Sequence, residues 1–267
     1  MPHEQPPPAV LRAFGVGGPA RRLAGGQGTS WVAGGLVLKP GGGPLHEWLA
    51  GALAGVTADG FRVAAPVPTR DGGWAHEGWS ATRWVAGDEP DHSAISTWRA
   101  ILAAGRAFHR AVAHLGRPGF LDARDDWWAR ADRAVWGERD MRFLPEFEAL
   151  ARRLYAVREP LGSSQIVHAD LTRNVLFAPG LPAAVIDISP YWRPPEYAEG
   201  VVVADALCWH GAPPHLPGAV GVPVAAVARA LLFRLATTNE RVTSGAGGVD
   251  VRDEARRYAR AAAAIGV

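Results

Sequence analysis

The sequence of 267 residues has one cysteine, Cys208, so no internal disulfide can form. It lacks a run of about 18 uninterrupted apolar residues, the length that a membrane-spanning helix needs. Its first residues are rich in proline, where a secretory signal would be apolar. The 28 basic residues nearly balance the 26 acidic ones, which leaves no strong positive field for nucleic acid. We therefore expect a cytoplasmic protein that binds a small molecule, not a nucleic acid or a membrane.

Lysine is almost missing, and the single lysine among the 28 basic residues is Lys39. An ammonium group is a compact point charge, whereas a guanidinium group is a wide planar fork. An ammonium therefore fits better where phosphate oxygens lie in a tight pocket. Lys39 is a candidate phosphate ligand, and the alternative is a lysine that has no special function at the end of a strand.

Glycines break the N-terminal part into short extended segments. The pair Gly34-Gly35 predicts a two-residue hairpin, because such turns require positive φ angles. A second cluster contains Gly25, Gly26 and Gly28. This cluster either lets backbone N–H groups approach an anion or only turns the chain.

The rest of the first third alternates between helical and extended patterns. We expect a helix over 44–53 and two strands over 61–67 and 74–85. Together with the hairpin, these segments predict a small, mostly β, N-terminal unit over residues 1–87.

The period changes after residue 92, and the remaining chain, residues 88–267, reads as mainly helical. A long amphipathic helix is expected from Ser93 to Leu115, followed by helices over 144–157, 222–236 and 250–265. The last of these begins with Asp250, a suitable N-cap. Small-molecule sites form preferentially between two such domains.

Four polar residues stand between apolar, strand-like runs: His168, Asp170, Asn174 and Asp187. Each one taken singly has an ordinary structural explanation as a core histidine, a turn former or a cap. Taken jointly with Lys39, they match what phosphoryl transfer requires. That reaction needs an acceptor for the hydroxyl proton, oxygen ligands for Mg²⁺ and a cation on the nucleotide phosphates.

At these residues the sequence resembles the aminoglycoside phosphotransferase and choline kinase branch of the protein-kinase-like fold. The segment His168-x-Asp170-x-x-x-Asn174, followed by Asp187, carries the resemblance. It implies an α+β, bilobal fold with a small β-rich N-lobe that binds nucleotide and a larger, mainly helical C-lobe. The C-lobe would hold the catalytic loop and the acceptor site.

The resemblance also implies roles for individual residues. Asp170 corresponds to the catalytic aspartate, and Asn174 and Asp187 correspond to the Mg²⁺ ligands. Lys39 would bridge the α- and β-phosphates of ATP, and Glu47 on the following helix would orient it.

Further nucleotide contacts are implied from the glycine cluster and from the segment between the lobes. Gly25, Gly26 and Gly28 would cover the phosphates, and the backbone from Arg83 to Val85 would meet the adenine. Two more residues, His168 and Asp205, would support the catalytic loop structurally.

The sequence departs from the protein-kinase pattern after Asp187, where Ile188-Ser189 replaces Phe-Gly. Only seven residues separate Asp187 from Pro195-Glu196, too few for the segment on which protein substrates dock. We therefore expect a small-molecule hydroxyl acceptor.

The sequence says little about which molecule accepts the phosphoryl group. The chain has 11 tryptophans, which we expect mainly in the core. An alternative is an aromatic and acidic wall that attracts a cationic amine or amino sugar. The residues of this alternative wall are Asp122, Asp125, Asp126, Trp127, Trp128, Trp192, Glu196 and Glu199.

Three functions follow in order of preference. The first is an ATP- and Mg²⁺-dependent small-molecule kinase that phosphorylates a hydroxyl of a metabolite or antibiotic. The second is a degenerate protein of the same fold that binds nucleotide without chemistry. The third is a metal-dependent hydrolase in which His168, Asp170 and Asp187 hold the metal with His210 or His215.

Overall fold

The computed structural model describes residues 5–23 and 28–267, and the chain divides into two compact units. Unit 1 contains Met1–Asp88 and Leu176–Asp187, and unit 2 contains Glu89–Val175 and Ile188–Val267. The sequence suggested a single cut near residue 87, whereas the structure returns residues 176–187 to unit 1. Of the predicted glycine cluster, Gly25 and Gly26 lie outside the described residues.

Unit 1 is built around a five-stranded sheet with the strand order β1-β2-β3-β6-β5. Its strands are β1 (Arg21–Arg22), β2 (Trp31–Ala33), β3 (Leu36–Pro40), β5 (Pro66–Val67) and β6 (Trp79–Arg83). The turn between β2 and β3 contains Gly34 and Gly35, with φ angles of 52° and 76°. The predicted hairpin is confirmed. Helix α2 (Gly43–Ala54) follows β3, where a helix was predicted.

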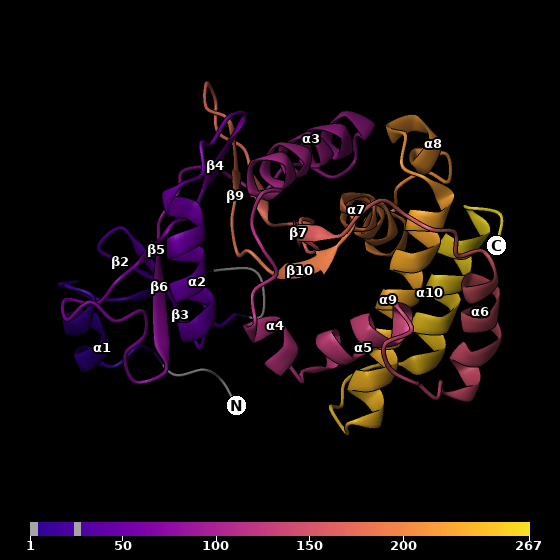
Figure 1. The fold of residues 1–267 in the computed structure, drawn as a ribbon, viewed down its shortest axis with the longest axis horizontal. Helices are drawn as coiled ribbons and strands as arrows, with labels where there is room; N and C mark the ends of the chain where they lie inside the picture. The colour runs from indigo at the N-terminus through magenta and orange to yellow at the C-terminus, as the bar shows by residue number, and fades with distance from the viewer. Residues whose placement is uncertain (1–4, 24–27) are drawn as a thin grey trace. The chain divides into compact units, whose positions relative to one another are not determined.

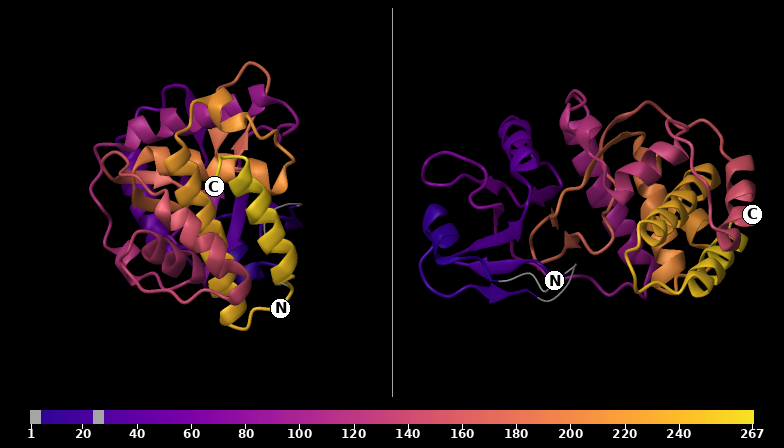
Figure 2. Two further views of the ribbon diagram at one scale, coloured as in Figure 1. Left: turned by 90° about the vertical axis from the view of Figure 1, so that its right-hand side faces the viewer. Right: turned by 90° about the horizontal axis from the view of Figure 1, so that it is seen from below.

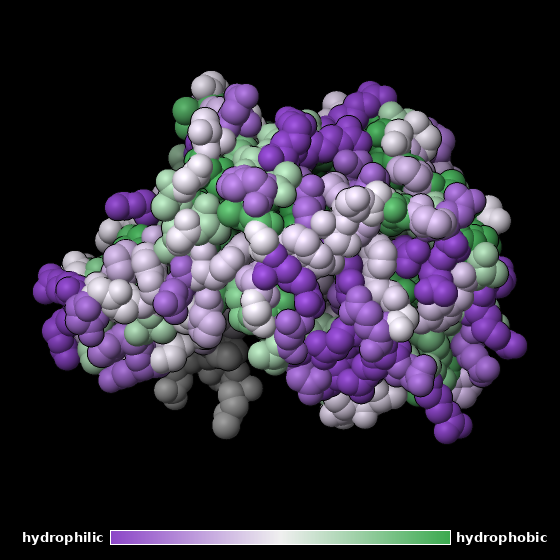
Figure 3. Space-filling view, in the orientation of Figure 1, coloured by the Kyte–Doolittle hydropathy of each residue, from purple (hydrophilic) through white to green (hydrophobic). Residues whose placement is uncertain are grey.

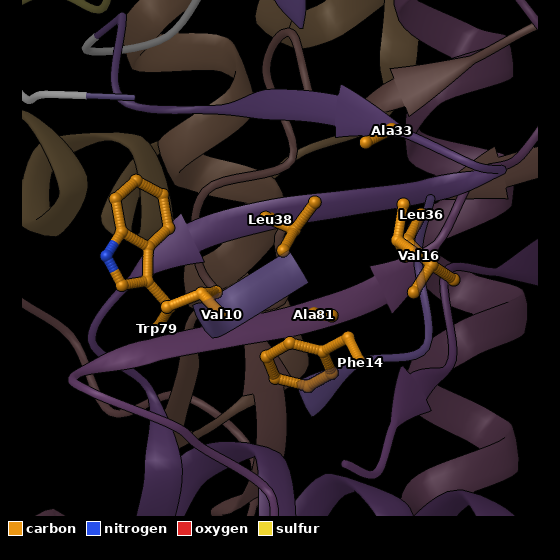
Figure 4. Close-up of a cluster of buried hydrophobic side chains, with 8 residues drawn as sticks. All are labelled: Val10, Phe14, Val16, Ala33, Leu36, Leu38, Trp79 and Ala81. Atoms are coloured by element: carbon orange, nitrogen blue, oxygen red, sulfur yellow. The ribbon is translucent and has the colours of Figure 1, made fainter. Parts of the chain in front are cut away.

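The hydrophobic core of unit 1 lies between this sheet and the short helix α1 (Pro8–Ala13), as Figure 4 shows. Its buried members are Val10, Phe14, Val16, Ala33, Leu36, Leu38, Trp79 and Ala81. Successive residues of a strand point to opposite faces, so burying Leu36 and Leu38 turns Lys39 away from this core.

The strand predicted over 61–67 was wrong as a single element. The chain forms β4 (Phe61–Val63) and then β5, and these belong to different sheets. β4 pairs in parallel with β9 (Ala183–Val185) in a three-stranded sheet of order β4-β9-β8, where β8 is Val175–Leu176. Pro66 cannot donate a ladder hydrogen bond, which favours a break just before it.

The strand predicted over 74–85 is also shorter in the structure, because β6 begins at Trp79. Glu77 and Gly78 have φ angles of 46° and 74°, so the chain turns immediately before the strand. Left-handed backbone of this kind cannot continue a β-ladder.

Unit 2 is mainly helical, as expected (Figure 1). Its helices are α3 (Ile95–Val112), α4 (Phe120–Ala123), α5 (Trp127–Val135), α6 (Pro145–Ala156), α7 (Pro195–Trp209), α8 (Leu216–Val220), α9 (Val224–Thr243) and α10 (Val251–Ala263). The Asp250 side chain accepts hydrogen bonds from the amides of Arg252 and Asp253, which confirms it as the N-cap of α10.

Helix α9 is central in unit 2, where it packs against α5, α6, α7 and α10 (Figures 1 and 2). Most of its residues are buried, because its sequence is apolar on nearly every side. Gly200 of α7 faces the backbone of Ala226 of α9, and a β-carbon there would clash. This close approach packs α7 directly against α9 at Gly200.

A two-stranded antiparallel ribbon, β7 (Gln165–His168) with β10 (Pro190–Arg193), completes unit 2, and His168 lies opposite Pro190. The fold is therefore α+β, with a sheet-containing N-terminal region and a helical C-terminal region. Hydrophilic side chains gather over α5 in Figure 3. Within the residues described, no helix has the length and apolar character required to cross a membrane.

Candidate functional site

In unit 1, the ammonium of Lys39 lies 2.6 Å from Oδ2 of Asp187. Their side chains are 32% and 52% exposed, so both remain accessible to a ligand. Asp187 follows β9 and has a φ angle of 50°. This left-handed conformation is uncommon outside glycine but is tolerated by aspartate, and it is typical of strained functional positions.

Helix α2 carries His46 and Glu47, and of these two side chains His46 is the partly buried one. The pKa of His46 is lowered, first by burial; Lys39 also lowers it and Asp187 raises it, so the imidazole lies within range of both charges. Its Nδ1 lies 2.7 Å from the carbonyl oxygen of Gly42. Gly42 has a φ angle of 92°, a conformation that favours glycine at the start of α2.

The prediction that Glu47 orients Lys39 is not met. Glu47 is exposed, and no ion pair joins it to Lys39 among the described residues. Neighbouring residues of a helix point about 100° apart, since a turn contains about 3.6 residues. With His46 turned inward, Glu47 necessarily points elsewhere.

The other predicted nucleotide contacts in unit 1 are partly engaged within the fold. Gly28 has a φ angle of 67°, and its carbonyl oxygen accepts a hydrogen bond of 2.8 Å from Nε of Arg22. The amides of Arg83 and Trp84 donate to the carbonyls of Ala65 and Gly35. The amides of Arg83 and Trp84 are thus used within the fold.

In unit 2, the catalytic loop expected from the sequence follows β7. Nδ2 of Asn174 donates to the backbone oxygen of Asp170 at 2.7 Å and lies 3.3 Å from its Oδ2. Because the amide nitrogen is directed to Asp170, the amide oxygen Oδ1 is not the atom that makes this contact. The Asp170 side chain is 45% exposed, so its carboxylate can meet a substrate.

His168 is completely buried, and its ring holds this loop through hydrogen bonds to backbone amides. Its Nδ1 accepts hydrogen bonds from the amides of Asp170 and Ser189, at 3.3 and 3.4 Å. Its own amide donates to Nε2 of His109 on α3 at 3.0 Å. Burial lowers the pKa of His109 to about 3, so this imidazole stays neutral and can accept.

The structure does not support the histidine ligands that the metal-dependent hydrolase would require. The ring of His168 is turned to backbone amides, and His210 packs against His92 and Trp98, with ring centroids 4.4 and 5.4 Å away. His215 is exposed at the start of α8. Across residues 5–23 and 28–267, no group of three or more histidine, cysteine or acidic side chains could hold a metal ion.

Asp205 is buried on α7, as expected for a residue that supports the loop, and its partner is Arg234 of α9. The guanidinium donates to both Asp205 oxygens at 2.7 and 2.6 Å and to Oδ1 of Asp170 at 3.0 Å. Burial raises the pKa of Asp205, and Arg234 counteracts this. No role for Arg234 was predicted from the sequence, where its only signal was a charge inside an apolar helix.

A second ion pair that was not predicted from the sequence involves Arg173, the residue before Asn174. Its φ angle is 66°, and its guanidinium donates to both oxygens of Glu89 at 2.7 and 3.2 Å. Glu89 is the first residue of unit 2. Arg173, with its left-handed backbone, is thus tied to the start of this unit.

The proposed acidic wall is largely neutralised by arginines. Arg117 pairs with Asp122 at 2.6 Å, and Arg106 pairs with Glu199 at 2.5 Å. Asp126 caps α5 by accepting from Ala129. These acids therefore serve the fold and add little attraction for a cation.

Of the two remaining acids of the wall, one is paired with arginines, whereas Oε2 of Glu196 is buried with no hydrogen-bond partner among the described residues. Asp125 pairs with Arg130 and Arg133, at 3.4 and 3.3 Å. Trp127 and Trp128 pack against one another, with ring centroids 5.0 Å apart. Trp192 lines a cavity whose other lining residues include four arginines: Arg117, Arg124, Arg133 and Arg193.

The comparisons with known proteins concern the whole chain. No protein-family model matches the sequence, and a search of curated proteins finds no match. Among solved structures, the chain is similar to an aminoglycoside phosphotransferase from Alicyclobacillus acidocaldarius. The identity is 19%, covering 97% of this chain and 93% of that one, at a TM-score of 0.62.

Two further structures give the same result. A choline/ethanolamine kinase family protein from Mesorhizobium loti is 21% identical, covering 95% of this chain and 90% of that one, at a TM-score of 0.57. A thermostable mutant of aminoglycoside phosphotransferase APH(4)-Ia, in ternary complex with AMP-PNP and hygromycin B, is 16% identical, covering 97% of each chain, at a TM-score of 0.59. The resemblance expected from the sequence is confirmed at the level of structure: this chain has the fold of the aminoglycoside phosphotransferases and choline kinase-like proteins.

Proposed function

We propose that this protein is a small-molecule kinase that transfers the γ-phosphoryl group of ATP to a hydroxyl group. The observation that carries the proposal is the ion pair between Lys39 and Asp187. It joins the one lysine of the chain to the carboxylate that the resemblance assigns to the metal. A metal–nucleotide complex requires a cation for phosphate oxygens and a carboxylate for the metal at one place.

In the proposed reaction, the acceptor's hydroxyl oxygen forms a bond to the γ-phosphorus. The bond from that phosphorus to the β,γ-bridging oxygen breaks, and the electron pair leaves with ADP. Asp170 accepts the hydroxyl proton and later releases it to solvent. Such a transition state needs little covalent help, so the protein acts mainly through orientation and charge.

The donor set fits Mg²⁺, which prefers carboxylate and carbonyl oxygens. Asp187 would supply a carboxylate, and Asn174 would supply Oδ1, since its Nδ2 is committed to Asp170. An amide oxygen coordinates without adding a further negative charge. Bound Mg²⁺ would neutralise charge on the β- and γ-phosphates.

The remaining residues take supporting roles in the proposal. Lys39 would hold the α- and β-phosphates, and the backbone at Gly28 and Val85 would contact the phosphates and the adenine. His168 and Asp205 would keep the catalytic loop in place. The similarity to a phosphotransferase whose structure contains AMP-PNP and hygromycin B supports a nucleotide and a small acceptor.

The experiment is a nucleotide-consumption screen with Mg·ATP over aminoglycosides, nucleosides, choline-like amines and sugars. We expect ADP formation with at least one class of acceptor. Asp170→Ala is expected to lower turnover by about 10²- to 10⁴-fold, as loss of a general base does. Its affinity for Mg·ADP should stay close to that of the parent, because Asp170 contacts no nucleotide in the proposal.

Two results would contradict the proposal. If Asp170→Ala turned over at the parent rate, the catalytic assignment would be wrong. If the parent bound ATP but formed no product with any acceptor, the protein would instead be a degenerate nucleotide-binding member of this fold.

A further inference from the structure

Arg234 joins two carboxylates of unit 2 through one guanidinium group. Nε and Nη2 donate to the two oxygens of Asp205, and Nη2 also donates to Oδ1 of Asp170 at 3.0 Å. Arg234 and Asp205 are 13% and 7% exposed, whereas Asp170 is 45% exposed. The arginine therefore connects a buried anchor to the accessible carboxylate of the catalytic loop.

The position of the Arg234 guanidinium is determined by its buried partner. A bidentate pair between arginine and a carboxylate defines the plane of the fork as well as its distance. The backbone is held too, because Tyr258 Oη of α10 donates to the carbonyl oxygen of Arg234 at 3.2 Å. Asp170 thus receives its hydrogen bond from a group that has little freedom to move.

The two oxygens of Asp170 differ in their contacts. Oδ1 is bound by Arg234 at 3.0 Å, whereas Oδ2 has a longer contact of 3.3 Å with Nδ2 of Asn174. That amide nitrogen makes its shorter hydrogen bond, 2.7 Å, to the backbone oxygen of Asp170. Oδ2 is therefore the oxygen with more capacity to accept a further hydrogen bond.

We propose that Arg234 is a positioning residue for Asp170, which holds Oδ1 so that Oδ2 accepts the hydrogen of the acceptor hydroxyl. This inference rests on the proposed kinase function. A half-exposed aspartate without this contact would sample several rotamers, and small errors in placing a reacting group are costly to turnover. Arg234 acts through Asp170 and need not touch the substrate.

The test compares Arg234→Gln and Arg234→Lys with a matched control on the same helix. Glu240 of α9 pairs with Arg130 of α5 at 2.6 Å, and both side chains are mostly buried. Glu240→Gln therefore breaks another ion pair of α9 without touching Asp170. Circular dichroism and thermal melting identify the variants that fold, and ADP formation from Mg·ATP is measured with water and with the screened acceptors.

We expect Arg234→Gln to lower kcat by about 10²-fold, with KM for ATP within about twofold of the parent. Arg234→Lys should recover only part of kcat, because an ammonium cannot serve both carboxylates with a planar fork. Glu240→Gln should keep the parent kcat. In an Asp170→Asn background, Arg234→Gln should not lower kcat further, because the carboxylate that Arg234 positions is already absent.

The opposite results would overturn the inference. A folded Arg234→Gln variant with the parent kcat would show that Asp170 needs no such partner. An equal loss of kcat in the Asp170→Asn background, or in Glu240→Gln, would show that α9 acts only as structural support. If Arg234→Gln does not fold, the inference is tested with Arg234→Lys, measured alone and in the Asp170→Asn background. A parent without any ADP formation would instead refute the kinase function itself, and with it this role.

Discussion

Lys39 Nζ lies 2.6 Å from Asp187 Oδ2, although these residues belong to segments far apart in the chain. The contact exists because residues 176–187 return to unit 1 through the parallel pairing of β9 with β4. The end of β9 therefore places Asp187 beside Lys39 of β3. Both side chains are partly exposed, and in the proposed function this pair is where a metal–nucleotide complex binds.

Replacement of this lysine should weaken nucleotide binding. Lys39→Met removes a charge-assisted contact to phosphate, and such hydrogen bonds contribute about 1.5–3 kcal/mol. The affinity for Mg·ADP should therefore fall by about 10- to 100-fold, as measured by isothermal titration calorimetry. Folding stability should change little, because the ion pair with Asp187 is partly exposed.

Glu47→Gln is the matched control for this measurement. Glu47 is exposed and has no ion pair with Lys39 among the described residues, so its affinity for Mg·ADP should stay within about twofold of the parent. If Lys39→Met and Glu47→Gln lowered the affinity for Mg·ADP equally, Glu47 would have the role that was predicted for it from the sequence.

The left-handed backbone at Arg173 should respond to the shape of its side chain. β-Branched residues tolerate positive φ poorly, so Arg173→Val should lower the free energy of unfolding by about 1–3 kcal/mol. Arg173→Gly loses the same pair with Glu89 but accepts a φ angle of 66° without strain. Urea unfolding of the two variants separates the contributions, and identical midpoints would show that the backbone is not strained here.

His109 should make the fold sensitive to acid. Burial lowers the pKa of its imidazole to about 3 in the folded state, compared with about 6.5 when it is exposed. The unfolded chain therefore binds the extra proton between these values. The stability that depends on a neutral His109 is complete above about pH 6.5 and is lost as the pH falls toward about 3.

The measurement is the free energy of unfolding of the parent and of His109→Gln at pH 7 and pH 5. A glutamine oxygen can still accept from the amide of His168 but does not titrate. The variant should therefore lose less stability than the parent over this interval. Equal losses would mean that other groups, such as His46 and His92, whose pKa values are also lowered chiefly by burial, account for the dependence.

Gly200 should be sensitive to a single added methyl group. A β-carbon there would clash with the backbone of Ala226, which cannot move as the end of a flexible side chain can. Overpacking of this kind typically costs about 1–3 kcal/mol, so Gly200→Ala should lower the thermal midpoint. Gly218→Ala on α8 is the control, because its β-carbon meets no atom within 4 Å. Equal midpoints for the two variants would contradict the close packing of α7 on α9.

Much of the fold could be predicted from local patterns in the sequence. The Gly34-Gly35 hairpin, the N-cap at Asp250 and the helix after β3 depend on neighbouring residues, and each is confirmed. The strand over 61–67 failed because a local pattern does not say which partner each half will pair with. Phe61–Val63 pairs with β9, whereas Pro66–Val67 pairs with β6.

The sequence by itself determined which residue types and spacings were available: one lysine, and the run from His168 to Asn174 followed by Asp187. Only the tertiary structure decided that Asp187 is the partner of Lys39 and that Arg234 binds both Asp205 and Asp170. The physical reason is that helix register and helix packing select the partner of a charged side chain. These depend on buried contacts between distant segments, which no local pattern in the chain contains.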